Sequence, residues 1–479
     1  MEIEENYNFE KINLKKLLEA TCRASNNFQF LSLLKAKEAI LKHGKYSKKE
    51  LETILNSLID AETARKYFLK ELFQREPLTL EEIIKIFDFD ENQIIRDIFY
   101  LKAQGYIDEI IESQDVRKYK VKHLKDSFKP KVNYFEPVSK INDLGNCCHC
   151  GLCLSLCPLD CIDLSTNYLY VDEETCIKCG LCYSVCPQSF SFDEMYNSLK
   201  SRDSSVKESK NFGYYNNIYS ATTSVDAFKE KGQHGGVATT LLYYLLNKNL
   251  VDAVITIKHS KSFWKPKIEI VEDKSELYNT TGRIYSHSPI LSILDKAKKY
   301  DRVAIVALPC MIRALVKASF FPIKLPFFNN IKYKIGLFCI ESFSYENIAQ
   351  LLNEKFNIDI EEITKMNIVK GRFFVTLDSG EITSVSLTEC DPYGFNYCHY
   401  CGDITSEMAD ISIGPIGSKV GWSTVITRNK TGEDLFKGAV DQNLIEKTPL
   451  IDINVFQTNL EKINLEKKSK CITVELQKF

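Results

Sequence analysis

The chain has 479 residues, of which 44% are hydrophobic and 26% charged, and its formal net charge is -2. This length exceeds a single ordinary hydrophobic core and predicts several domains. The balanced charge argues against a protein that mainly wraps nucleic acid or lies on an anionic membrane. No run reaches the roughly 18 apolar residues needed to cross a bilayer. The acidic start, residues 1–5, lacks the form of a secretory signal, so we expect a cytoplasmic protein.

The amino-terminal region has helical periodicity. Apolar residues recur every three or four positions at 13–18 and 30–41, which predicts a helical extension over residues 1–70. Thr79-Leu80-Glu81-Glu82 has the form of a capped helix start. A second helix is expected near 91–104 and a hairpin over 105–119. This order resembles a winged-helix domain over residues 71–125.

A DNA-binding role for that domain is the weaker interpretation. The expected second helix, residues 91–98, is not basic. Because contacts to phosphates supply most of the affinity for DNA, this helix offers few of the donors required. A docking module is therefore favoured, and a redox-sensing DNA-binding regulator is kept as an alternative.

The rest of the chain predicts a multidomain protein of the α+β and α/β classes. Residues 126–143 read as a linker, 144–195 as a cysteine-rich domain and 196–213 as a second, polar linker. Residues 216–450 alternate apolar strands with helical stretches, which predicts an α/β domain. Residues 451–479 form a tail to which no role is assigned.

Ten of the seventeen cysteines lie between Cys147 and Cys186, a clustering that indicates metal in a reducing compartment. Two runs have the spacing C-x2-C-x2-C-x3-C-P of bacterial two-cluster ferredoxins, in which the fourth cysteine ligates the other cluster. One predicted [4Fe-4S] ligand set is Cys147, Cys150, Cys153 and Cys186. The other is Cys176, Cys179, Cys182 and Cys157.

Other interpretations of these cysteines were weighed. Zinc knuckles need four ligands in two separated pairs, and two complete, repeated runs favour iron–sulfur clusters instead. Cys148 and Cys161 lie outside the register of the runs, and we expect them to be small buried residues.

Several short motifs follow the ferredoxin-like runs in a fixed order, and none is decisive alone. They are Gly232–Leu242, Leu250–Val254, Thr281–Pro289, Ala307–Cys310, Gly336–Cys339, Lys370–Arg372, Tyr397–Cys401, Ala409–Gly414 and Gly421–Ile426. In this order they resemble the coenzyme F420 hydrogenase/dehydrogenase beta-subunit family. The resemblance covers about residues 144–435, including the cysteine runs.

The resemblance implies a bound FAD in an F420-oxidoreductase domain. A helix opening at Gly235 and Gly236 would present free amides and a positive dipole end to a phosphate. Further small, hydroxyl or basic residues suit the pyrophosphate or the acidic F420 tail: Thr239, Thr240, Gly282, Arg283, Ser286, Lys370, Gly371 and Arg372. His234 and Arg283 depart from the family, which commonly has Asp and Lys there.

The resemblance also implies a third [4Fe-4S] cluster beside the flavin, ligated by Cys310, Cys339, Cys398 and Cys401. The alternative is a CxxC zinc or redox pair with two unrelated buried thiols. Cys390 is a spare candidate ligand. Cys22 and Cys471 are expected to be structural.

These expectations predict an FAD- and iron–sulfur-dependent coenzyme F420 oxidoreductase. F420 exchanges electrons as a hydride and clusters carry them singly, so a flavin is needed between them, and no acid–base residue is required. The expected partner is a hydrogenase, a formate dehydrogenase, a one-carbon enzyme of the CO or formylmethanofuran type in an anaerobic archaeon, or ferredoxin. One alternative is a ferredoxin-dependent flavoprotein that reduces another organic substrate.

Overall fold

The structure is a computed structural model. The residues that it describes are 28–73, 75–87, 89–103, 105–112, 116–122, 138–164, 168–189, 192–232, 234–260, 264–282, 284–320, 324–325, 327–369, 371–450, 456 and 458–463. The helix expected at 13–18, Cys22, Cys471, Arg283 and Lys370 lie outside them. Contacts divide the chain into two compact units, described separately: residues 1–137 with 173–181 and 322–325, and residues 138–172 with 182–321 and 326–479.

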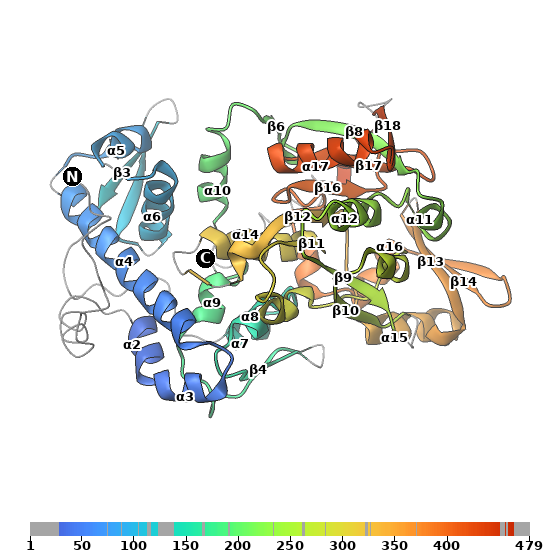
Figure 1. The fold of residues 1–479 in the computed structure, drawn as a ribbon, viewed down its shortest axis with the longest axis horizontal. Helices are drawn as coiled ribbons and strands as arrows, with labels where there is room; N and C mark the ends of the chain where they lie inside the picture. The colour runs from blue at the N-terminus through green and yellow to red at the C-terminus, as the bar shows by residue number, and fades with distance from the viewer. Residues whose placement is uncertain are drawn as a thin grey trace. The chain divides into compact units, whose positions relative to one another are not determined.

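The first unit combines helices with a three-stranded antiparallel sheet of order β1-β3-β2 (Figure 1). Its elements are α2 (Phe28–Lys35), α3 (Lys37–His43), α4 (Lys48–Phe73), β1 (Leu78–Thr79), α5 (Leu80–Ile86), α6 (Glu91–Ala103), β2 (Ile107–Ile111) and β3 (Arg117–Val121). The helix start expected at Thr79 is confirmed: Thr79 and Glu82 form a reciprocal capping box. The second helix and the hairpin are confirmed as well. The assignment to the winged-helix fold stays a prediction.

The interior of this unit joins α4 to α6 through both apolar and ionic contacts. The ring of Phe68 meets Phe87 edge-on, with centroids 4.5 Å apart. Arg65 on α4 contacts Asp97 on α6 at 3.0 Å, and both side chains are buried. Burial raises the pKa of Asp97, although Arg65 opposes this. Removing either partner would leave a buried charge unpaired, so this pair holds the two helices in one register.

The second unit is built on an eight-stranded mixed sheet of order β10-β9-β11-β12-β16-β17-β8-β18. Its strands are β8 (Asn217–Thr223), β9 (Ala253–His259), β10 (Pro266–Val271), β11 (Val303–Ala307), β12 (Ile331–Leu337), β16 (Ile411–Gly414), β17 (Ser423–Thr427) and β18 (Ile445–Pro449). The neighbours β9, β11, β12 and β16 are parallel, and the outer pairs are antiparallel. Most of the strands predicted over 216–450 therefore belong to one large sheet with a parallel centre, and residues 363–386 form a separate three-stranded sheet.

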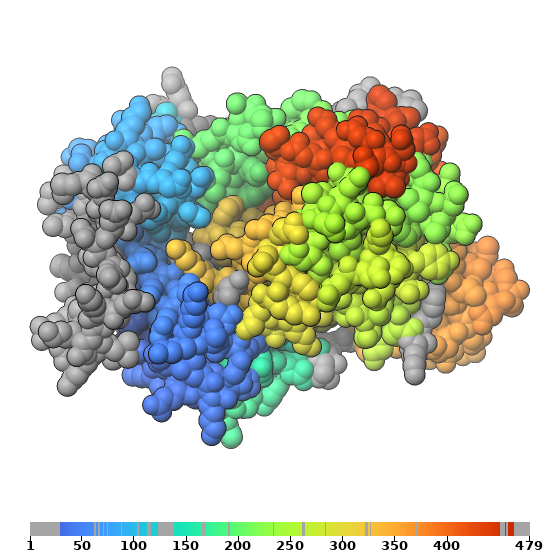
Figure 2. Space-filling model, viewed as in Figure 1, coloured from blue at the N-terminus to red at the C-terminus, as the bar shows by residue number. Residues whose placement is uncertain are grey.

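Two helices, α12 (Val237–Asn247) and α17 (Lys430–Asp441), share a hydrophobic core with this sheet. They lie side by side in the ribbon and on the surface of the molecule (Figures 1 and 2). Leu241 and Leu245 on α12 are fully buried, as is Phe436 on α17. Burial of several such side chains, each worth about 1.5–3 kcal/mol, fixes the two helices on the sheet.

Smaller sheets and helices complete the second unit. They are β4 (Ile162–Asp163) paired with β5 (Tyr170–Val171), β6 (Lys207–Ser209) paired with β7 (Gly213–Tyr215), and a sheet of order β13-β14-β15 (Ile363–Val369, Arg372–Leu377, Ile382–Ser386). The remaining helices are α7 (Ser139–Asp143), α8 (Leu152–Leu156), α9 (Leu181–Val185), α10 (Asp193–Lys200), α11 (Asp226–Lys231), α13 (Leu294–Ala297), α14 (Pro309–Phe320), α15 (Tyr345–Phe356) and α16 (Leu387–Cys390). Leu181, the first residue of α9, belongs to the first unit.

The linker expected over 196–213 is wrong. This segment contains most of α10, all of β6 and the start of β7. Its Ser- and Lys-rich composition gave no indication that the side chains of Tyr196 and Phe212 are buried. The expected tail also contributes to a core, because Phe456 and Leu460 are fully buried in a cluster that includes Phe212.

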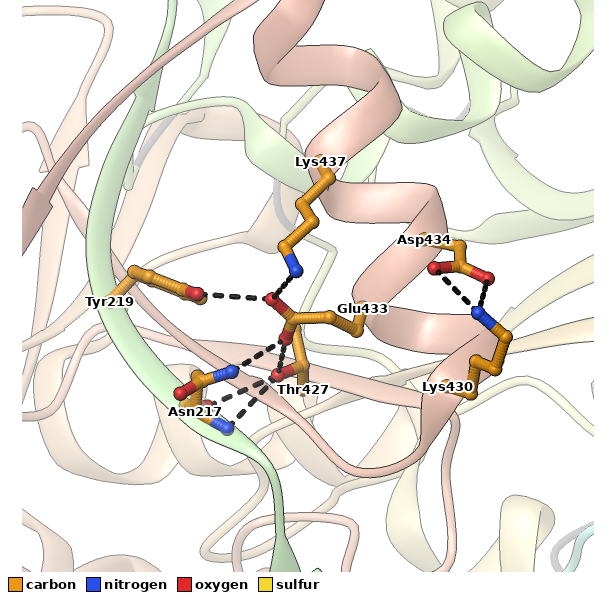
Figure 3. A network of polar contacts seen from close by, with 7 residues as sticks. All are labelled: Asn217, Tyr219, Thr427, Lys430, Glu433, Asp434 and Lys437. Carbon is orange, nitrogen blue, oxygen red and sulfur yellow. Dashed lines mark hydrogen bonds and ion pairs between the residues drawn. The ribbon is translucent and has the colours of Figure 1, made fainter. Parts of the chain in front are cut away.

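A buried carboxylate joins α17 to β8 and β17 of the large sheet (Figure 3). Glu433 accepts hydrogen bonds from Tyr219 Oη at 3.1 Å and Asn217 Nδ2 at 3.1 Å, and a further one from Thr427 Oγ1. Lys437 adds an ion pair at 3.2 Å. Burial alone raises the pKa of Glu433, but the hydrogen bonds, led by that of Thr427, lower it by more, so the net shift is downward.

We predict that Glu433→Ala speeds amide hydrogen exchange in β8 and α17. The change leaves Tyr219 and Asn217 without their acceptor, which costs about 2 kcal/mol of local stability. Because the folded-state pKa is depressed, this contribution is present above the unfolded pKa of about 4.3 and is lost as the pH falls through the folded value. Lys430→Ala is the matched control: Lys430 is exposed and pairs with Asp434 on the same helix, so exchange should stay unchanged.

Hydropathy gives no sign of a membrane-spanning segment in the part of the chain that the structure describes. No helix there is both long and apolar enough to cross a bilayer.

Candidate functional site

Two of the predicted ligand cysteines follow neighbouring parallel strands. Cys310 lies in the first turn of α14, directly after β11, and Cys339 follows β12. Because β11 and β12 are parallel, their carboxyl ends meet at one edge of the sheet, where ligand sites of such sheets commonly form. The backbone N–H of Cys339 donates to Ile404 O at 2.9 Å. This bond brings the segment that follows Cys398 and Cys401 to the same edge.

These four cysteines line a single hollow. The structure also places a fifth thiol there, which the sequence did not lead us to expect: Cys148, from the first ferredoxin-like run. The remaining lining is mostly apolar or aromatic, formed by His287, Leu308, Pro309, Ile340, Ser342, Phe395, Tyr397 and Asp403. The structure thus brings the predicted third set together, and the role of these residues as ligands stays a prediction.

A second hollow lies within the ferredoxin-like module. Its lining contains the whole of the first predicted set, Cys147, Cys150, Cys153 and Cys186, together with Cys148 and Cys182. The other predicted set is divided between the units, with Cys176 and Cys179 in one and Cys157 and Cys182 in the other. That set therefore stays a prediction from spacing.

The donor chemistry of the two hollows fits [4Fe-4S] clusters. A single zinc ion needs four ligands that converge at about 2.0–2.3 Å. Among the residues described, no three Cys, His, Asp or Glu side chains are grouped so as to hold a metal ion, so the fit rests on the types of residue that line the hollows. Burial raises the pKa of Cys147 and of Cys186 to about 12. Because a metal binds the thiolate, assembly of a cluster here would release protons.

The first cysteine run is fixed to the large domain by close backbone contacts. Leu291 N–H donates to Cys150 O at 3.1 Å. Gly151 has φ +84°, and a Cβ there would lie 2.5 Å from Pro289 O. His287 adds a side-chain contact, because its Nε2 donates to His149 O at 3.0 Å.

The imidazole of His287 is held in one neutral form. Its Nδ1 accepts from Ser342 Oγ at 2.9 Å while Nε2 donates to the His149 carbonyl. Burial lowers the pKa of His287 to about 4, so the ring is uncharged near neutral pH. The ring of Phe395 stacks on His149 with centroids 4.5 Å apart. These contacts join His287 and Phe395, which line the first hollow, to His149, which lines the second.

Helix α14 connects the two hollows along one of its faces. Cys310, Arg313 and Lys317 follow one another at intervals of three and four residues and therefore share a face. Arg313 makes two hydrogen bonds to Asp193, at 2.6 and 2.7 Å. Lys317 Nζ donates to Cys186 O at 2.6 Å, and burial lowers the pKa of Lys317 to about 7. The helix that carries one predicted ligand thus holds the segment that carries another.

A fully buried arginine supports the loop that follows Cys401. Arg428 donates to Thr405 O and Thr405 Oγ1, both at 2.9 Å, and to Ser412 Oγ at 2.9 Å. It also donates to the carbonyls of Phe212 and Tyr214. This network joins the loop to β16 and to the segment wrongly expected to be a linker.

The predicted phosphate-binding helix start is present. Gly235 and Gly236 have φ +73° and +64°, and a Cβ on Gly235 would lie 3.0 Å from Ala221 O. Thr240 is fully buried and its hydroxyl bonds to Gly236 O and Thr223 Oγ1, so it supports the turn. Thr239 is half-buried.

Of the other predicted cofactor contacts, Gly282 and Ser286 lie outside the helices and strands, and Gly371 and Arg372 lie at the turn into β14. Gly282 has φ +112°. Ser286 is buried, and its hydroxyl has no hydrogen-bond partner among the described residues, which is also true of Ser288. A Cβ added at Gly371 would meet no described atom within 4 Å beyond the neighbouring residues, and Arg372 is exposed and donates to Ser384 across the β14–β15 pair. Roles for all of these residues stay predictions.

Two remaining cysteines differ in their surroundings. Cys390 is fully buried in the apolar core around β13–β15 and lines neither hollow, so it is not placed to be a ligand. Cys161 is buried, as expected, and its sulfur lies 3.2 Å from Cys157 Sγ.

We predict that Gly151→Ala loosens the first cysteine run. The added methyl group would collide with Pro289 O and with Ser292 N, 2.5 and 2.9 Å away. Overpacking of this kind costs about 1–3 kcal/mol beyond the left-handed backbone strain. The measurement is hydrogen exchange at 147–153, together with iron retained after anaerobic reconstitution. Gly380→Ala is the matched control, since Gly380 has φ +85° and nothing within 4 Å; equal effects of the two changes would contradict the contact.

Comparison with known proteins gives family matches over the same regions. The sequence model of the coenzyme F420 hydrogenase/dehydrogenase beta subunit amino terminus matches residues 218–295, and that of the carboxyl terminus matches residues 300–453. A 4Fe-4S binding domain matches residues 169–190, which contain the second cysteine run.

Individual relatives are identical to the chain at about a third of the aligned positions. A coenzyme F420 hydrogenase subunit beta from Methanothermobacter thermautotrophicus is 33% identical over 262 residues, covering 54% of this chain and 93% of the relative. A coenzyme F420-dependent sulfite reductase from Methanocaldococcus jannaschii is 32% identical over 350 residues, covering 68% of this chain and 52% of the relative. A chain of the xenon-derivatised F420-reducing [NiFe] hydrogenase complex from Methanosarcina barkeri superposes with a TM-score of 0.54 at 30% identity, covering 56% of this chain and 94% of that chain.

Proposed function

The chain belongs to the coenzyme F420 hydrogenase/dehydrogenase beta-subunit family, and from that premise we propose that it is the F420-reactive subunit of an electron-transferring oxidoreductase. Coenzyme F420 is the proposed substrate, and the electrons would pass to or from a partner protein. The observation that carries this proposal is the pair of cysteine-lined hollows, which meet at a single residue, Cys148. The second hollow has a use only if electrons pass beyond the site that reacts with F420, to or from a partner protein.

The cofactors proposed are FAD and three [4Fe-4S] clusters. When bound, FAD would exchange a hydride with F420 and the clusters would carry single electrons. Cys310, Cys339, Cys398 and Cys401 would hold one cluster, and the two ferredoxin-like sets would hold the others. The residues themselves exclude water, since the linings of both hollows are mostly apolar and their cysteines are buried or half-buried.

The flavin phosphates are assigned to the start of α12. Its first backbone amides, after Gly236, carry the positive end of the helix dipole, and Thr239 can add a hydroxyl. The unpartnered hydroxyls of Ser286 and Ser288 suit polar groups of a bound cofactor. The basic Arg283, Lys370 and Arg372 are proposed for the pyrophosphate or the acidic tail of F420.

The proposed partner is a larger metalloenzyme, such as a hydrogenase, a formate dehydrogenase or a one-carbon enzyme, or else free ferredoxin. Related chains are named as subunits of an F420 hydrogenase and of an F420-dependent formate dehydrogenase. The first unit is proposed as the docking module. Two large apolar side chains of this unit are exposed: Ile111 on the wing-like hairpin by 62%, and Phe73 on α4 by 48%. Exposed apolar side chains are better suited to contact another protein than the phosphate backbone of a nucleic acid.

The test is anaerobic reconstitution of the full chain with iron, sulfide and FAD. We predict about twelve bound irons, because each of the three ligand sets holds four. We also predict retained FAD and reversible, flavin-dependent hydride exchange with F420, followed by its absorbance. Protein that bound zinc in place of iron, or that reduced another substrate but not F420, would refute the proposal.

Single substitutions then separate the third site from the ferredoxin-like sites. Cys339→Ala should lower the iron content by about four atoms per chain, because a cubane needs all of its thiolates. Electron transfer from F420H2 to an external acceptor should fall with it, while FAD binding persists. Cys390→Ala is the control, since this thiol is buried elsewhere in the same unit. An unchanged iron content in Cys339→Ala would remove Cys339 from the ligand set.

A further inference from the structure

The outer surface of the ferredoxin-like module carries a group of exposed apolar side chains. Leu144 is 68% exposed, Tyr168 52% and Tyr170 59%. A hydrogen bond joins the two segments that carry them, because Tyr168 Oη donates to Asp143 Oδ1 at 2.6 Å, directly before Leu144. We call Leu144, Tyr168 and Tyr170 the module patch. In the described part of the second unit, the other exposed large apolar side chains are widely separated in the sequence: Tyr278, Ile382 and Val420.

A single layer of the chain separates the module patch from the hollow of the first predicted ligand set. Leu169 lies between the two exposed tyrosines, is buried and lines that hollow. Neighbouring side chains of an extended segment point to opposite faces, so Tyr168 and Tyr170 face outward. Helix α7 repeats this arrangement, since its Ile141 lines the hollow while Leu144, just after the helix, is exposed. At the module patch, the first ferredoxin-like site therefore comes close to the surface.

The charged residues around the module patch are mostly acidic. Those of residues 138–172 are one lysine, Lys140, and four aspartates, Asp143, Asp160, Asp163 and Asp172. Asp163 lies directly opposite Tyr170 in the β4–β5 pair, so their side chains share one face of it. With Asp143 bonded to Tyr168, each tyrosine of the patch has a carboxylate beside it. A complementary surface has an apolar centre and a basic rim.

We propose that the module patch is the surface through which single electrons pass between the first ferredoxin-like site and a redox protein with a Lys- and Arg-rich rim. This inference rests on the proposed function and selects among its partners: a basic face of a larger metalloenzyme fits, and an acidic carrier does not. Each encounter oxidises one group and reduces the other by one electron, and no bond forms or breaks. A small patch suits the small interfaces of transient electron-transfer complexes.

The experiment uses the full chain, reconstituted with FAD, iron and sulfide, reduced by F420H2 and mixed with cytochrome c as a basic one-electron probe. Stopped flow gives the second-order rate constant of cytochrome c reduction. We expect Leu144→Ser and Tyr170→Ser each to lower it about fivefold, because each removes a large contact from the centre of the interface. Reduction of the chain by F420H2, recorded separately, should stay native and shows that each variant is folded.

Two further variants test the charge of the rim and the position of the patch. Asp163→Lys should slow transfer to cytochrome c at low ionic strength, and the difference should disappear at high salt. Ile382→Ser is the matched control, because Ile382 is 65% exposed on β15 of the same unit and lines neither hollow. Its rate constant should equal that of the native chain.

Several outcomes would overturn the inference. They are native rates in Leu144→Ser and Tyr170→Ser, an equal loss in Ile382→Ser, and faster transfer to cytochrome c in Asp163→Lys. A native dimer that Tyr170→Ser converted to a monomer would make the patch a contact between copies of this chain, which also overturns it. A native chain that F420H2 cannot reduce would instead count against the proposed function, and dithionite-reduced chains would then still test the module patch.

Discussion

The contact between the first cysteine run and residues 287–292 is the constraint on which the rest of the site depends. It is made by backbone atoms, through Leu291 N and Cys150 O, and it requires a residue without a side chain at Gly151. Backbone contacts of this kind leave little room for adjustment. They place the thiols of a small, loop-rich module against a sheet edge that carries thiols of its own, so two sulfur-lined spaces share one wall.

The large sheet supplies the second half of this arrangement. Parallel β11 and β12 end at the same edge, and each is followed within three residues by a cysteine. The CxxC segment, residues 398–401, is held at this edge through the residues that follow it. Cys339 N–H donates to Ile404 O, and the buried Arg428 donates to Thr405 O. These contacts hold the four cysteines of the predicted third set at one edge of the sheet.

Much of this could be predicted from the sequence, and the reasons are local. The spacing of the cysteine runs, the capping box at Thr79 and the glycines before α12 each act over a few residues, so their structural meaning can be read directly. Membership in the family was also recognisable, because several short motifs occur in the expected order. The cysteines that follow β11 and β12 were found in the same way.

The failures concern packing between distant segments. Tyr196 and Phe212 lie in a polar stretch whose average composition is that of a linker, and only the tertiary structure shows that both rings are buried. Cys148 was expected to be an ordinary buried residue, because it lies outside the ligand spacing of the first cysteine run. Its neighbour Cys310 is 162 positions later in the sequence, and no local pattern connects the two.

Helix α14 has a geometric consequence for the spacing of the two sulfur-lined spaces. Cys310 and Lys317 are seven residues apart, which is close to two helical turns. The helix therefore separates the two residues by about 10 Å along its axis and keeps both on the same face. Point changes along its outer surface would leave that length intact. Adding or deleting a single residue between them would swing Lys317 by about 100° away from Cys186. Variation in this helix should therefore take the form of substitutions, with its length held constant.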